Sequence, residues 1–80
     1  MEDETLNKHL SKREIEILKL ITLELTSAEI AARLNLSIRT IETYRKRIIR
    51  KTGIANPIGL FKYAVRQGWV KGYFSTGSVS

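Results

Sequence analysis

The sequence has no cysteine and only one proline, one histidine and one tryptophan in 80 residues. Without cysteine there is no disulfide framework and no thiolate metal site, a composition compatible with a reducing cytoplasm. No apolar run is long enough to cross a bilayer. The N-terminal stretch MEDETLNKHL is acidic and polar, unlike a signal or transit peptide. We therefore expect a cytoplasmic protein with no membrane partner.

Residues that catalysis and metal binding need are also scarce. His9 is the only histidine, and we expect it to be an exposed residue just before a helix cap. No serine, carboxylate pair or glycine-rich loop has a catalytic context. We therefore expect neither an enzyme nor a cofactor or metal site.

Three hexapeptides repeat one pattern: LSKREI, LTSAEI and LSIRTI, at residues 10–15, 25–30 and 36–41. In each, a hydroxyl residue can cap a helix, and the flanking leucine and isoleucine fit a hydrophobic staple. Glu14 and Glu29 complete capping boxes in the first two copies, whereas the third has Thr40 at that position. The copies are unevenly spaced, so they indicate three helix starts separated by tight turns and not a solenoid.

The caps, the apolar spacing and the residues that end helices predict a four-helix, all-α domain without strands. Asn35, Gly53 and Gly68 are suited to end the last three helices, and Asn56 with Pro57 to start the fourth. The expected helices are about 12–23, 27–34, 38–52 and 57–67. The domain should span 10–70, between a linker or disordered N-terminus at 1–9 and a disordered tail at 71–80. Tyr63 and Trp69 should belong to its core and not to a base-stacking platform.

The net charge of +6 is concentrated in one segment. Residues 37–52 hold six basic residues and one acid, Glu42, whereas residues 11–36 hold equal numbers of each. Such a stripe usually indicates a polyanionic partner. The alternative, a solvated lysine-rich face, normally contains interspersed acids, which are nearly absent here.

Residues 26–46 combine a short helix, a turn of about three residues and a longer basic helix, which is the helix-turn-helix arrangement. An ordinary corner between two bundle helices is the alternative, and the basic charge argues against it. On a helical wheel, Ile41 and Ile48 face inward, and Arg45 falls near the apolar side. The opposite side carries Arg39, Thr43, Lys46 and Arg50.

A helix of this kind fits the major groove of double-stranded DNA. Arg39, Lys46 and Arg47 could reach guanine or phosphate, Glu42 could accept from a cytosine amino group, and Thr43 could pack on a thymine methyl. Arg50 and Lys51 suit phosphate contacts, which position without specifying sequence.

Thr40 has two interpretations. The start of the third helix would meet a DNA phosphate, and a glutamate there would repel it, so threonine keeps a hydroxyl without the charge. Alternatively, threonine is simply tolerated at this position.

Together, LSKREIEILKLI and LTSAEIAARLNLSIRTIETYRKRIIRKTGI resemble the LuxR/FixJ-type (GerE-like) helix-turn-helix domain, over about residues 10–70. The matching residues are Leu10, Arg13, Glu14, Ile17, Leu18, Glu29, Ile30, Ala31, Leu34, Ser37, Thr40, Ile41, Ile48, Lys51 and Gly53. The resemblance implies a DNA-binding domain, usually the C-terminal output module of a bacterial response regulator or autoinducer receptor. Its third helix would enter the major groove, and its fourth would form a homodimer.

The resemblance also implies which residues bind. Groove or phosphate contacts fall on Arg39, Glu42, Thr43, Lys46 and Arg47, and backbone-side contacts on Ser27, Thr40, Tyr44, Arg50 and Lys51. Ile58, Lys62 and Arg66 are the expected dimer contacts on the fourth helix. The chain departs from the family pattern at Glu24, Ala28, Tyr44, Arg47 and Thr52, where the family often has Gly, Lys, His, Asn and Leu.

Other classes remain open at this stage. Sigma-factor region four has a similar sequence pattern, but it normally ends soon after the recognition helix. RNA polymerase is a further candidate partner. A helical protein-interaction domain would bind with little salt dependence. Asp3 is the only aspartate and no βα pattern is present, so no receiver domain is expected within this sequence. It therefore represents an excised output domain or a stand-alone regulator.

Overall fold

The computed structural model describes residues 9–71, and these form four helices. The helices are α1 (Lys12–Thr22), α2 (Ser27–Leu34), α3 (Ile38–Thr52) and α4 (Pro57–Gln67). The all-α prediction is confirmed, and the expected helix ranges agree except that α1 ends one residue earlier than predicted, with Leu23 as its C-cap. The linker or disordered N-terminus predicted at 1–9, apart from His9, and the disordered tail predicted at 71–80, apart from Lys71, lie outside the described residues.

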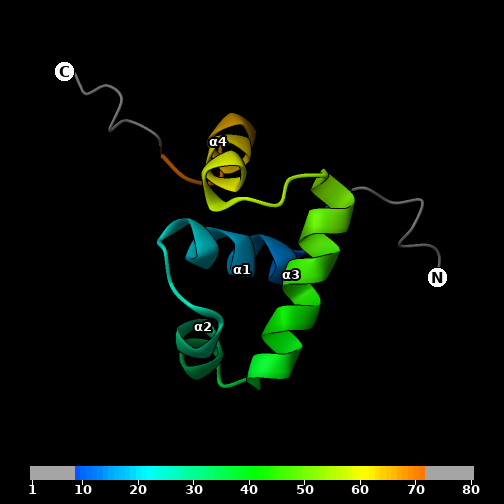
Figure 1. Cartoon of the computed structure of the whole chain (residues 1–80). Helices are drawn as coiled ribbons and strands as arrows, with labels where there is room; N and C mark the ends of the chain where they lie inside the picture. The colour runs from blue at the N-terminus through cyan, green and yellow to red at the C-terminus, as the bar shows by residue number, and fades with distance from the viewer. Residues whose placement is uncertain (1–8, 72–80) are drawn as a thin grey trace.

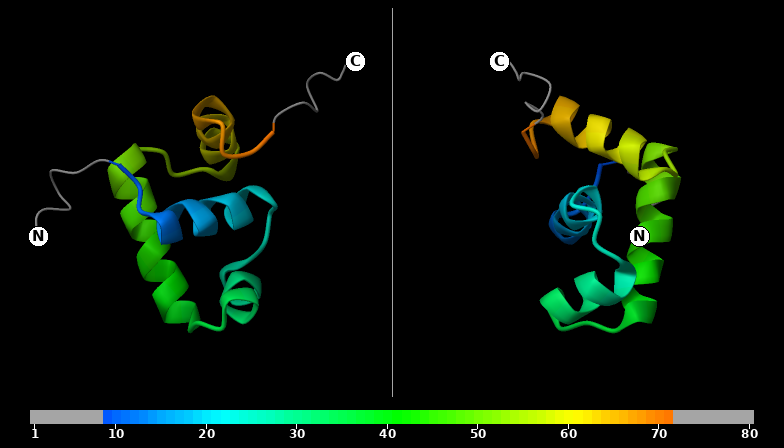
Figure 2. Two further views of the ribbon diagram at one scale, coloured as in Figure 1. Left: turned by 180° about the vertical axis from the view of Figure 1, so that it is seen from behind. Right: turned by 60° about the vertical axis from the view of Figure 1, so that its left-hand side comes forward.

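The longest helix, α3, forms one side of the domain (Figure 1). α1 lies at the centre and contacts each of the other three helices, and α2 also contacts α3. Figure 2 shows α2, α1 and α4 stacked on the same side of α3, so that the opposite side of α3 is not covered by another helix. The arrangement leaves one side of the basic helix open to a partner.

The predicted caps are all present. The hydroxyls of Ser11 and Thr26 accept hydrogen bonds from the backbone N–H groups of Glu14 and Glu29, each at 3.1 Å. The two carboxylates accept in return from the backbone N–H groups of the cap residues, at 2.8 and 2.7 Å. Each reciprocal pair satisfies two backbone donors that a helix start otherwise leaves unpaired.

The start of α3 is built differently. The hydroxyl of Ser37 accepts from the backbone N–H of Thr40 at 3.0 Å, and the Thr40 hydroxyl lies 2.8 Å from the Ser37 hydroxyl. The first turn of α3 contains no acidic residue. Thr40 therefore takes part in capping while leaving the positive end of the helix dipole without a carboxylate.

Tight turns follow α1 and α2 because a left-handed residue comes directly after the C-cap of α1 and at the C-cap of α2. Glu24 has φ 66° and Asn35 has φ 59°. The next residues, Leu25 and Leu36, donate their backbone N–H groups back to Leu20 at 3.5 Å and to Ala31 at 2.9 Å. A left-handed glutamate costs about 1 kcal/mol, so the turn at Glu24 forms without the glycine that the family resemblance led us to expect there.

The core is aliphatic and lies where α1 meets the other helices. The large aliphatic side chains that are fully buried come from α1, α2 and α3: Ile17, Leu18, Ile30, Ile41 and Ile48. Leu60 and Ala64 bring α4 onto the same cluster, and Tyr63 and Trp69 pack at its edge with their rings T-shaped and 5.7 Å apart. These two aromatic residues were predicted to belong to the core; they are half-buried and pack against it.

Candidate nucleic-acid interface

The uncovered side of α3 carries the side chains that the helical wheel placed there. Its exposed residues are Arg39, Glu42, Thr43, Lys46 and Arg50. Within residues 9–71, the cations of Arg39, Lys46 and Arg50 form no ion pair with a carboxylate. The inward residues Ile41 and Ile48 are 0% exposed. α3 thus separates a buried apolar side from an outer side that carries uncompensated positive charge.

Arg47 and Tyr44 lie together on the flank of α3. The Arg47 guanidinium carbon is 5.6 Å from the centre of the Tyr44 ring, a cation–π arrangement. Both residues are half-buried. The contact limits the rotamers of Arg47, so this extra cation is held beside the exposed face.

Arg45 lies on the inner edge of α3, as the wheel predicted. It is half-buried and lines a shallow groove of about 420 Å³ together with Ile21, Leu25, Pro57 and Ile58. These neighbours belong to α1, the turn after it and the start of α4, so Arg45 lies apart from the exposed cations of α3.

Ser27 and Glu42 contact each other across the helix-turn-helix. The Ser27 hydroxyl, at the first residue of α2, donates a hydrogen bond to the Glu42 carboxylate on α3. The sequence suggested separate roles for these residues, phosphate binding for Ser27 and base reading for Glu42. The structure brings them together, so each constrains the orientation of the other.

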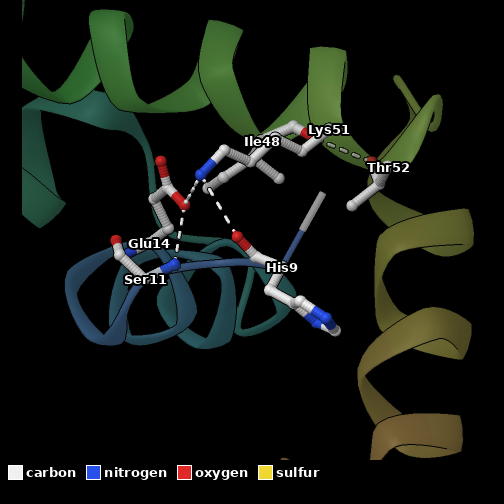
Figure 3. Close-up of polar contacts among 6 residues, drawn as sticks. All are labelled: His9, Ser11, Glu14, Ile48, Lys51 and Thr52. Atoms are coloured by element: carbon white, nitrogen blue, oxygen red, sulfur yellow. Dashed lines mark hydrogen bonds and ion pairs between the residues drawn. The ribbon is translucent and has the colours of Figure 1, made fainter. Parts of the chain in front are cut away.

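Lys51 points into the domain, contrary to the expectation that it sits outward beside Arg50. Its side chain is only 8% exposed, and its ammonium lies 2.9 Å from a carboxylate oxygen of Glu14. The same ammonium donates to the backbone carbonyl of His9 at 3.2 Å (Figure 3). Lys51 thus lies apart from the outward-facing cations of α3. Lys51 follows Arg50 by 100° around the helix, which moves it from the outer side to the flank, and from there a long lysine stem can reach a buried partner.

Sequence reasoning did not identify Glu14 as a partner of the basic helix α3. It is 1% exposed, and burial alone would raise its carboxyl pKa. The hydrogen bond from the Ser11 backbone N–H and the hydrogen bond and charge of Lys51 outweigh burial, so the pKa lies below its ordinary value. The capping pattern identified one bond of Glu14, but Lys51 lies 37 residues away, and no local signal links the two residues.

The outer side of α4 is exposed at every residue proposed for dimerisation. Ile58 is 70% exposed, and Lys62 and Arg66 are also exposed. Leu60 and Ala64, on the opposite side of the helix, are buried in the core. α4 thus presents an apolar residue followed by two cations at four-residue spacing.

Residues 9–71 contain no cluster of three or more metal-ligating side chains. None of the four helices described is both long and apolar enough to span a bilayer. His9 is exposed, as expected from its position before the Ser11 cap, and in Figure 3 its imidazole points away from the Lys51 ammonium.

Comparison with known proteins agrees with this geometry. The family model of bacterial regulatory proteins of the luxR family (GerE) matches residues 8–64. A response regulatory protein of Escherichia coli strain K12, YgeK, is 44% identical over 62 residues, which cover 78% of this chain and 42% of that protein. The oxygen regulatory protein NreC of Staphylococcus aureus strain JH9 is 40% identical over 60 residues, covering 75% of this chain and 28% of NreC.

The chain thus spans less than half the length of these curated relatives. No solved structure matches it at a significant level. The family match covers α1, α2 and α3 entirely and the first part of α4, so it includes both the capped turns and the basic helix. The chain belongs to the LuxR family of bacterial regulatory proteins and is a helix-turn-helix DNA-binding domain of that family.

Proposed function

We propose that this domain is the output module of a bacterial two-component response regulator and that it binds specific double-stranded DNA sequences through α3. One observation carries the proposal: the side of α3 that no other helix covers holds exposed cations that are uncompensated within residues 9–71. A polyanion lying along this side would meet these exposed cations. The response-regulator relatives favour this role for the whole protein.

In this proposal, some residues of α3 reach base edges in the groove and others contact the DNA backbone. Arg39, Glu42, Thr43 and Lys46 face base edges, with Arg47 on the flank. Thr40, Tyr44 and Arg50 lie on the backbone side, where phosphate contacts set the register. Ser27 at the start of α2 is placed for a phosphate and also holds Glu42, so contact between this corner and DNA would compete with their mutual hydrogen bond.

The dimeric state is a further part of the proposal. Ile58, Lys62 and Arg66 share the exposed side of α4, and Ile58 is a large apolar residue that is 70% exposed. A two-fold dimer through this helix would bury Ile58 and present two copies of α3 to successive half-sites. Lys62 and Arg66 would lie at the edge, where water still screens their charge. We place the protein in the bacterial cytoplasm, with RNA polymerase as a possible further partner.

The test of DNA binding is selection of duplexes from a random pool, followed by affinity measurements over a series of salt concentrations. We expect the logarithm of the affinity for the selected sequence to fall steeply with the logarithm of salt concentration, because binding releases counterions from phosphates. A flat plot would remove DNA as the partner and favour a protein-interaction domain.

Two substitutions on the exposed side separate base reading from phosphate contact. Lys46→Ala should lower the preference for the selected operator over random DNA by about 1–3 kcal/mol. Arg50→Ala should weaken both kinds of DNA alike and reduce the salt slope by about 1. Equal losses on operator and random DNA for both variants would refute this division of roles.

A further inference from the structure

Three parts of the chain meet at the ammonium of Lys51. The carboxylate of Glu14 lies 2.9 Å away, in the first turn of α1, and the backbone carbonyl of His9 accepts at 3.2 Å (Figure 3). Glu14 also accepts from the Ser11 backbone N–H at 2.8 Å. One cation thus joins the last turn of α3 to the capped start of α1 and to the residue that leads into it.

This pair supplies directional contacts between α1 and α3. One turn before Lys51, Ile48 packs in the aliphatic core, and apolar packing of that kind tolerates small shifts of one helix along another. A buried hydrogen-bonded ion pair fixes both distance and direction. Because Lys51 is only 8% exposed and Glu14 is 1% exposed, water does not readily replace either partner.

We propose that Lys51 is a positioning residue for DNA binding. Held by Glu14 and the His9 carbonyl, it fixes the angle and depth at which α3 is presented to the groove, and it does not itself bind a phosphate. The inference rests on the proposed function, in which α3 is the helix that enters the groove. A contact residue must be held to within about 0.5 Å to discriminate well, so loss of this anchor degrades base reading.

The competing role for Lys51 is the direct phosphate contact that its place in a basic helix suggests. That role would require the ammonium to leave Glu14, and the carboxylate would then stay buried without its cation. Removing one partner of a buried pair is strongly unfavourable. Arg50, the exposed neighbour of Lys51, provides the matched control because it can reach a phosphate without breaking any ion pair within residues 9–71.

The experiment measures the operator-to-random affinity ratio and the salt slope for the parent and four variants, at a temperature where circular dichroism shows each to be folded. Glu14→Gln and Lys51→Met should each lower the ratio by about tenfold and leave the slope unchanged. Arg50→Met should reduce the slope by about 1 and leave the ratio unchanged. Glu16→Gln, which alters an exposed carboxylate on the same helix, should change neither quantity.

Glu14→Gln gives the sharpest result because it keeps an oxygen for the Ser11 N–H and leaves every cation of α3 in place. It decides the question even if Lys51→Met fails to fold. An increase in DNA affinity for Glu14→Gln, or a reduced salt slope for Lys51→Met, would overturn the proposal in favour of a direct phosphate contact. An unchanged ratio in the folded variants would also overturn it. Failure of the proposed function is seen separately, as a parent that selects no sequence or binds without salt dependence.

Discussion

Arg50 and Lys51 are neighbouring cations in the last turn of α3, yet they lie in different surroundings. Arg50 is exposed on the uncovered side, whereas the Lys51 side chain is 8% exposed and bonded to Glu14 and His9. Both favour the negative end of the helix dipole. They differ because only Lys51 faces α1, where a buried carboxylate is already held by the Ser11 cap. The charge of a basic helix is therefore not all available to a partner.

The largest expected effect is on the free energy of unfolding, which should depend on Lys51 and hardly at all on Arg50. Lys51→Met leaves the Glu14 carboxylate buried without its counterion, and we expect the free energy of unfolding to fall by about 3 kcal/mol. Arg50→Met should change it by no more than about 0.5 kcal/mol. Urea unfolding followed by circular dichroism measures both values. Similar small losses of unfolding free energy for the two variants would mean that the contacts of Lys51 stabilise the fold no more than those of Arg50.

Low pH should weaken the contact between α1 and the inner side of α3 in particular. The folded pKa of Glu14 lies below its unfolded value, so its contribution to stability is present above the unfolded pKa and is lost as pH falls through the folded one. We expect the parent to lose thermal stability as pH drops below about 5. Glu14→Gln should lose less over the same range, because it has no carboxylate to titrate. Parallel pH profiles for the two proteins would contradict a stabilising charge on Glu14.

The smallest expected effect concerns the outer start of α3. Thr40→Glu would supply the carboxylate that Glu14 and Glu29 supply in the other two capping boxes, which should raise stability by about 0.5 kcal/mol. The same charge would repel a phosphate at the helix start and weaken DNA binding. Thr40→Gln is the matched control, since it completes the capping box without charge. Unfolding and DNA-binding measurements on both variants would show whether folding and binding favour different residues here.

The expectations that depended on neighbouring residues are confirmed. Ser11, Thr26, Ser37 and Asn56 are all N-caps, and the helices they start were predicted to within one residue. Capping bonds join residues three apart, and the bonds that end the helices join residues three to five apart, so hexapeptides suffice to reveal them. The half-buried position of Arg45 was also predictable, because a wheel needs only the helical period.

Contacts between distant residues were not predictable in this way. Nothing near Ser27 indicates that its hydroxyl would meet Glu42 across the turn, and nothing near Lys51 indicates His9 or Glu14. Each of these pairs forms only after the helices have crossed at a particular angle. The helical period places Lys51 on the flank of α3, but the sequence could not show which carboxylate its ammonium would meet.

The amino-acid sequence by itself determined the four helices, their capped starts and the side of α3 that carries exposed charge, because caps and helical periodicity are local properties of the chain. The tertiary structure decided which cations remain available. Packing α1 against α3 buries the Glu14 carboxylate, and a buried charge requires a partner within hydrogen-bonding distance. Lys51 is the cation that this packing brings to it, and Arg50, one residue before, is left facing outward.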